Sequence, residues 1–315
     1  MKKTQVYFLN VGWGDAHFIV HPSGRLTLID GGDADPSQQE DYPLSWMDRH
    51  GFDTLDYMIL THLHDDHMNG LLDVVRHKNV LRAVLPYEPF TLPELATEAT
   101  QNNAVALQAY LLLKRYIEFI NLLNEHHVTI IWRREFKKTG QIVWDEKGVT
   151  LNHLYPSIHD PLPAHQALEY LLENLKEQQT LKEVEQQLTH FFHLSNHDSS
   201  VFLLVDEQEK DKGVLFGGDL MKEEWEILCR NPHLKAKVWK APHHGLDDAC
   251  TIETLRNLHP AHVIIPVCTA RSGRQLKIWK TLMEAVDIEL DLTGNYDKGS
   301  YRKLEGPIEV FIGSK

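Results

Sequence analysis

The chain has 315 residues, with 32 Lys and Arg against 45 Asp and Glu, so its formal net charge is −13. This length accommodates one large α/β domain or two smaller ones. The acidic balance argues against a protein that coats duplex DNA through a basic face, because phosphate binding depends largely on Lys and Arg. A phosphodiester substrate is still compatible with it, since bound divalent cations would reverse the local field.

The cysteines and the apolar runs indicate the compartment. Cys229, Cys250 and Cys268 are isolated and form no CxxC pair, which is typical of a reducing environment. The sequence contains no run of about 18 apolar residues that would predict a membrane-spanning helix. The apolar stretch near the N-terminus is interrupted by Gly12-Trp13-Gly14-Asp15, without a small-residue cleavage site. We therefore expect a cytoplasmic protein that has no membrane partner.

The first 60 residues predict strands separated by turns. Apolar runs at 6–11, 16–20 and 26–30 predict a β-meander, because Gly, Pro and Ser punctuate them. A short helix is expected over 44–51, followed by a strand over 57–60. Asp15 and the Asp30-Gly31-Gly32 segment are interpreted as turn chemistry.

Helices and strands alternate in the rest of the chain. Two helical insertions interrupt them, at about 90–127 and 160–193, and the second is amphipathic and rich in Glu and Gln. We expect this second insertion to be a pair of outer helices; a lid or an oligomer interface is the alternative. Further helices are expected over 69–77, 222–228, 252–257 and 275–286, and strands over 80–85, 128–132, 141–144, 149–154, 200–205, 214–216, 238–240, 263–267, 288–292 and 308–312.

The most informative motif is Thr61-His62-Leu63-His64-Asp65-Asp66-His67, which directly follows the strand predicted over 57–60. Histidine and carboxylate are ligands that borderline divalent metals prefer. His62 and His64 lie two residues apart on an expected extended loop, so both can point to one metal. Asp66 and His67 can face a second metal.

Three later segments also place polar ligands near a strand end: the histidines His193 and His197, the aspartate of Gly217-Gly218-Asp219, and the pair His243-His244. Strand ends at one edge of a sheet can converge although they are distant in sequence. Asp219 is the expected bridge between two cations, and the glycines before it allow close backbone approach. Two metals lower the pKa of a shared water, which supplies a hydroxide nucleophile and predicts hydrolytic chemistry.

Together these motifs resemble the metallo-β-lactamase fold, whose HxHxDH signature matches 62–67 and is followed by Asp219 and His243-His244. The flanking segments are similar to the C-terminal domain of the competence protein ComEC and its stand-alone relatives. These segments are Phe8-Leu9-Asn10-Val11-Gly12-Trp13-Gly14-Asp15-Ala16, the Pro22-Ser23-Gly24 turn with Leu28-Ile29-Asp30-Gly31-Gly32, Asn196-His197-Asp198-Ser199-Ser200-Val201, and Pro242-His243-His244-Gly245. The resemblance covers roughly 1–85 and 195–270.

The resemblance implies an α/β fold, a single αββα sandwich over 1–315 with two helical insertions and a metal site at one edge. It implies two divalent ions, Zn or Mn before Fe or Co. One ion would be held by His62, His64 and His197, with His193 and Asn196 as alternatives to His197. The other would be held by Asp66, His67 and either His243 or His244, with Asp219 bridging. Asp66, Asp219 and His244 are the expected catalytic residues.

The chain also departs from this family pattern. Trp13 stands where relatives usually carry Gln, and Asn10 where they carry Asp. His62 and His64 are both present, whereas many relatives have a weakened motif, and this favours two occupied metal sites. The resemblance does not explain the two insertions, which we expect to shape the substrate pocket.

The leading hypothesis is a binuclear metallohydrolase that cleaves a phosphodiester, in nucleic acid or in a small molecule, with a metal-bridging hydroxide. A second hypothesis keeps the chemistry but assigns a lactone, a thioester or another acyl substrate; a β-lactam is the least favoured of these. A third is a metal-binding scaffold whose insertions recruit a protein partner. A complete ligand set argues against this scaffold, which has no need of two metals.

Overall fold

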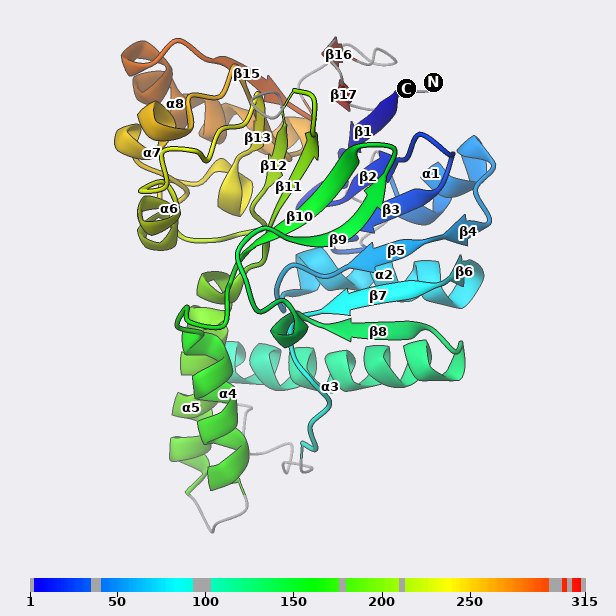
Figure 1. Ribbon diagram of the computed structural model, residues 1–315. Helices are drawn as coiled ribbons and strands as arrows, with labels where there is room; N and C mark the ends of the chain where they lie inside the picture. The colour runs from blue at the N-terminus through cyan, green and yellow to red at the C-terminus, as the bar shows by residue number, and fades with distance from the viewer. Residues whose placement is uncertain are drawn as a thin grey trace.

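The computed structural model describes residues 3–34, 41–92, 103–175, 180–209, 213–294, 302–304 and 308–312. Two β-sheets stack face to face, and helices pack on both outer surfaces (Figure 1). Apolar side chains from both sheets, among them Phe8, Ile59, Phe202 and Phe216, form the buried layer between them. The expected αββα sandwich is therefore confirmed.

The first sheet has eight strands in the order β16-β17-β1-β2-β3-β5-β7-β8. In chain order these are β1 (Thr4–Phe8), β2 (His17–Val20), β3 (Leu26–Ile29), β5 (Tyr57–Ile59), β7 (Arg82–Leu85), β8 (Thr129–Trp132), β16 (Arg302–Leu304) and β17 (Ile308–Ile312). From β3 to β8 the neighbouring strands run parallel. Their C-terminal ends therefore meet at one edge of the sandwich.

The second sheet has seven strands in the order β15-β14-β13-β12-β11-β10-β9. These are β9 (Gln141–Glu146), β10 (Val149–Tyr155), β11 (Val201–Asp206), β12 (Val214–Phe216), β13 (Val238–Lys240), β14 (His262–Ile265) and β15 (Glu289–Leu292). Strands β12 to β15 are parallel, so segments that follow them also share an edge. A small two-stranded sheet pairs β4 (Thr54–Leu55) with β6 (Asn79–Val80).

Helices form the outer layers. On the first sheet lie α1 (Pro43–His50), α2 (Asp65–His77) and α3 (Ala104–Glu125), and on the second lie α6 (Lys222–Leu228), α7 (Ile252–Leu258) and α8 (Thr269–Ala285). The second insertion is the pair α4 (Pro163–Asn174) and α5 (Leu181–Leu194), which extends away from the sandwich beside α3 (Figure 1). Among the described helices, none has the length and apolarity that a membrane crossing requires.

Two helix starts differ from the prediction. Helix α2 begins at Asp65 instead of 69, so part of the metal-ligand motif lies in its first turn, where aspartates interact favourably with the helix dipole. Helix α8 begins at Thr269 instead of 275, because its first turn lacks the apolar periodicity on which the prediction depended. Within the first insertion, 93–102 lies outside the described residues.

Candidate metal centre

The side chains of the predicted metal motif gather at the edge where β3, β5, β12 and β13 end. His62 and His64 follow β5 in extended backbone, and His67 lies in the first turn of α2. Asp219 follows β12, and His244 lies in the short 3-10 segment η5 (Pro242–Gly245) after β13. The parallel strand ends thus bring together residues that are 180 positions apart in sequence.

Two groups of ligand atoms form at this edge. In one, single atoms of Asp15, His67, Asp219 and His244 all lie within 4.8 Å of one another; in the other, atoms of His62, His64 and Asp219 do so. Asp219 belongs to both, because its Oδ2 lies 3.2 Å from the Nε2 atoms of His67 and His244 and 4.0 Å from Nε2 of His62.

Asp66 borders the first group. Its Oδ2 lies 3.2 Å from Nε2 of His244, and its Oδ1 lies 4.0 Å from Nε2 of His67. It is therefore placed to contribute a further oxygen to an ion at that position.

The unpaired atoms at the centre fit divalent metal ions. The Nε2 atoms of His62, His64, His67 and His244, and Oδ1 of Asp219, are buried without a hydrogen-bond partner among the described residues. Buried polar atoms are normally paired, so a convergent set of unpaired acceptors indicates a ligand. Imidazole nitrogens and carboxylate oxygens are the donors that Zn, Mn, Fe and Co share.

Asp30 orients the histidines through hydrogen bonds. Its carboxylate accepts hydrogen bonds from the amide (2.8 Å) and hydroxyl (2.7 Å) of Thr61 and lies 2.9 Å from Nδ1 of His67. A carboxylate at Nδ1 holds the ring proton there and leaves Nε2 free for a metal. The Thr61 hydroxyl lies 3.2 Å from Nδ1 of His62, which extends the same support to the other group.

A buried ion pair lies beside Asp30. Lys240 is fully buried at the end of β13, where its Nζ pairs with Asp15, donates to the carbonyl of Gly218 (2.8 Å) and lies 3.6 Å from Oδ1 of Asp219. Burial alone would raise the pKa of Asp15, but Lys240, together with neighbouring histidines, holds this pKa well below its usual range. Oδ1 of Asp15 lies 3.3 Å from Nδ1 of His244.

The interpretation of Asp15 and Asp30 as turn residues is therefore incomplete. Both are buried and face ligand histidines. Asp30 does so because β3 lies directly beside β5 and its end reaches the same edge. Lys240 was missed as well. The sequence does contain a signal for it: Lys240 ends an otherwise apolar strand shortly before Pro242-His243-His244-Gly245.

The structure separates the two adjacent histidines of η5. His243 (φ 46°) and His244 (φ 50°) both have left-handed backbone, a costly conformation for side-chain-bearing residues that clusters at functional sites. His244 faces the metal centre, whereas Nδ1 of His243 lies 2.7 Å from Oδ1 of Asp248. Nε2 of His243 lies 3.3 Å from Nδ2 of Asn196.

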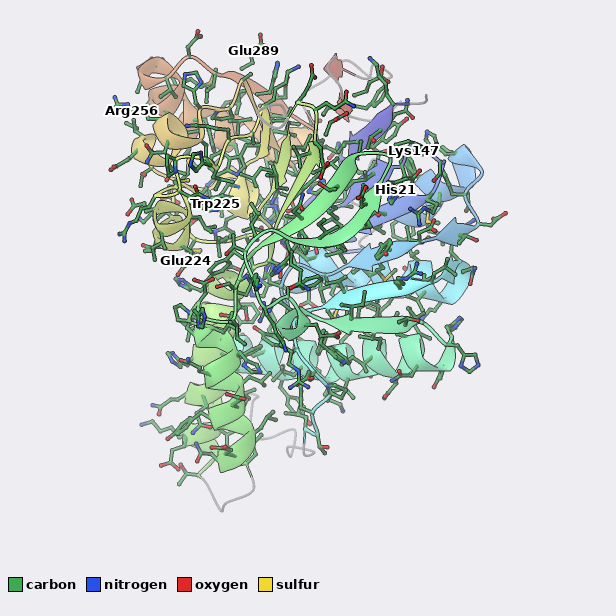
Figure 2. The ribbon with its side chains drawn as sticks, viewed as in Figure 1. His21, Lys147, Glu224, Trp225, Arg256 and Glu289 are labelled. Carbon is green, nitrogen blue, oxygen red and sulfur yellow. The ribbon has the colours of Figure 1, made fainter. Side chains whose placement is uncertain are left out.

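Three residues are the expected alternatives for the third ligand beside His62 and His64, and the structure distinguishes them. Nδ1 of His197 lies 2.9 Å from Oε1 of Glu224 on α6, labelled in Figure 2, and His197 is in neither ligand group. His193 is exposed on α5. Oδ1 of Asn196 is buried without a hydrogen-bond partner among the described residues. Asn196 is therefore the one of these three residues that has a free buried ligand atom.

Two glycines allow the segments of the centre to approach one another. A Cβ on Gly14 (φ 110°) would lie 2.0 Å from the carbonyl oxygen of Asp66. A Cβ on Gly218 (φ 49°) would lie 2.7 Å from Oγ1 of Thr61. The expected close backbone approach before Asp219 is confirmed.

Both helices of the second insertion, α4 and α5, supply side chains near this edge. A cavity of about 610 Å³ at the ends of β7, β8 and β10 is lined by Tyr87, Arg133 and Phe136 of the sandwich and by His165 of α4. Helix α5 contacts the metal centre itself, since the ring of Phe192 lies 4.7 Å from the ring of His64. The insertion therefore lines a pocket and touches a candidate ligand.

Comparison with known families agrees with this geometry. The family model of the Metallo-beta-lactamase superfamily matches residues 11–265. The chain belongs to this superfamily. The fold and the ComEC-like resemblance predicted from the motifs are thereby confirmed, as is membership of a metallohydrolase superfamily.

Individual relatives of this superfamily member are distant. ComE operon protein 3 of Bacillus subtilis (strain 168) is 23% identical over 278 residues, which cover 83% of this chain but only 28% of that protein. Igni18, a metallo hydrolase from Ignicoccus hospitalis KIN4/I, is 12% identical with a TM-score of 0.46, covering 94% of this chain and 96% of its own. Unliganded yeast PDE1 is 13% identical with a TM-score of 0.44, covering 93% and 98%.

Proposed function

We propose that the protein is a binuclear metal-dependent hydrolase that cleaves phosphodiesters. The observation that carries the proposal is the position of Asp219, which belongs to both groups of ligand atoms. A carboxylate shared by two cations can hold them close enough to act together on one phosphoryl group, as the metals of two-metal hydrolytic sites do. His62 and His64 would hold one ion, and Asp66, His67 and His244 the other, with Asp219 between them.

The charges around Asp219 support two cations. Three carboxylates of the centre are buried and a fourth is partly buried: Asp15, Asp30, Asp219 and, partly, Asp66. Lys240 is a buried cation beside them. Grouped carboxylates in a low dielectric are unstable unless positive charge compensates them. Two divalent ions would supply this charge and leave a field that attracts an anionic phosphodiester.

The chain's own residues fix the geometry of the reaction. When bound, the metals would supply Lewis-acid stabilisation of the phosphoryl oxygens and lower the pKa of a water. Asp30 holds His67 with Nε2 towards Asp219, and the hydroxyl of Thr61 supports His62. Asp15 faces the outer nitrogen of His244, and Lys240 holds Asp15 in place. The centre is thus oriented before substrate binds.

Metal analysis combined with a substrate panel tests this proposal. We expect about two equivalents of Zn or Mn per chain, and hydrolysis of phosphodiesters such as bis(p-nitrophenyl) phosphate. Asp219→Ala should lose both metal and turnover. His244→Ala should lose metal, whereas the adjacent His243→Ala should retain it, because His243 contacts Asp248 instead of the centre.

Other outcomes would redirect the assignment. Turnover of lactones or thioesters without phosphodiester cleavage would favour the acyl hydrolase. Metal content well below two, with intact folding and no turnover, would favour the scaffold with a protein partner. A cytoplasmic location stays a prediction; the described Cys229, Cys250 and Cys268 are all free thiols, as a reducing compartment requires.

A further inference from the structure

Helix α8 is fixed to the metal centre at two points. The amide of Cys268, at its N-terminal end, donates to the carbonyl of Gly12 (2.9 Å), in the turn that carries Trp13. Nε1 of Trp279 donates to the carbonyl of Gly245 (2.9 Å), directly after His244. The first turn of α8 is therefore held at the rim of the site.

Trp13 lies between this helix and a candidate metal ligand. Its ring centroid is 4.7 Å from that of His244, and the guanidinium carbon of Arg271 lies 4.3 Å from the Trp13 ring. Adding the two separations places the guanidinium within about 9 Å of the His244 ring. A guanidinium stacked on an aromatic face is pre-organised while its N–H groups stay available.

The charge of Arg271 is uncompensated. Arg271 is exposed, and within the described part of the chain no carboxylate forms an ion pair with it. Helix α8 also carries Arg274 and Lys277, which are exposed as well, although the chain as a whole has a net charge of −13. An unpaired guanidinium beside the metal centre can form charge-assisted hydrogen bonds with an anionic group of the substrate.

We propose that Arg271, supported by Trp13, binds a phosphate of the substrate other than the one that is cleaved. This inference rests on the proposed phosphodiesterase function and assigns it a substrate with several phosphates, a single nucleic-acid strand. The separation of at most about 9 Å between the guanidinium and the His244 ring leaves room for a second phosphate next to the one that is cleaved. Arg271 is therefore a specificity residue, and its contribution depends on a second phosphate being present.

The test compares Arg271→Gln with Lys280→Gln on the metal-loaded protein. Lys280 is exposed on the same helix, and nine residues are two and a half helical turns, so it lies on the opposite side from Arg271. Both variants lose one positive charge. Their kcat and KM are measured on a single-stranded oligodeoxynucleotide and on bis(p-nitrophenyl) phosphate, which has one phosphate, over a range of salt concentrations.

We expect Arg271→Gln to raise KM for the oligonucleotide about tenfold and to reduce its salt slope by about one, the effect of one lost phosphate contact. The effect on the small diester should be at least fivefold weaker, and Lys280→Gln should stay within twofold of wild type on both substrates. Equal effects of Arg271→Gln on both substrates, or equal effects of the two variants, would overturn the inference but leave the phosphodiesterase standing. A wild-type protein that cleaves neither substrate would overturn both.

Discussion

Asp30 offers a direct test of how the metal centre is supported, through Asp30→Asn. Asp30 is fully buried, and its backbone is left-handed (φ 58°), a conformation that Asn tolerates better than most residues. The substitution keeps the shape of the side chain but removes its charge and replaces one oxygen with an NH₂ group. The amide can still accept from Thr61, but it cannot also hold the ring proton of His67 as a carboxylate does.

The expected magnitude follows from this lost contact. Substitution of a residue that hydrogen-bonds a metal-ligand histidine typically weakens metal binding about 10–100-fold. This corresponds to roughly 1.4–2.7 kcal/mol of metal-binding free energy. Because His67 shares Asp219 with His244, we expect the ion held by Asp66, His67 and His244 to be weakened more than the ion held by His62 and His64.

Competition with a chelator of known affinity measures this change for each ion. Asp56→Asn is the matched control: Asp56 is also buried and also accepts a backbone hydrogen bond, from Leu26 at 3.1 Å. It precedes β5, however, and so lies at the edge of the sheet opposite to the metal centre. The control should bind both ions as wild type does. Unchanged metal affinity in folded Asp30→Asn, or an equal loss in Asp56→Asn, would refute the orienting role.

Two further predictions concern stability. Gly14→Ala places a Cβ 2.0 Å from the carbonyl oxygen of Asp66 and should lower both metal affinity and folding stability. Gly24→Ala is the control: at φ 93° with no atom within 4 Å, it should lower the free energy of unfolding in urea by only about 1 kcal/mol. Similar losses in the two variants would contradict the role of the contact with Asp66. Burial, assisted by Arg133, lowers the pKa of His153 to about 3, so its contribution to stability is complete above pH 6.5 and falls as the pH drops towards 3. Between pH 7 and 5 this amounts to about 2 kcal/mol, which His153→Phe should abolish; identical pH dependence in the variant would rule the effect out.

The strand patterns in the sequence predicted which strand ends carry the metal ligands, but not which side chains of neighbouring strands contact those ligands. The strand at 57–60 and the strand at 238–240 are short apolar runs bounded by polar motifs, and both are present with nearly the expected ends. The contact of Asp30 with His67 depends on β3 lying beside β5, and the pairing of Lys240 with Asp15 depends on the two sheets meeting. Strand order and sheet stacking are tertiary properties that local periodicity does not contain.

Backbone conformation explains another open choice. His243 and His244 are identical in type and adjacent, so composition and spacing assign them equally. Their consecutive left-handed φ values direct one ring to Asp248 and the other to Asp219. Such φ values are unusual for side-chain-bearing residues. Gly245, which follows them, packs closely against Trp279 and Ile265.

The second insertion bears on chemistry as well as on pocket shape. The ring of His64 lies 4.7 Å from that of Phe192 and hydrogen-bonds to the Phe192 backbone, so the last turn of α5 restrains a candidate ligand. Helix α5 in turn packs on α3 and α4, outside the short sequence motifs that predicted the metal centre. The orientation of His64 is therefore set by a part of the chain that its motif does not include. A change in this helix pair would alter the ion held by His62 and His64 before it altered the ion held by Asp66, His67 and His244.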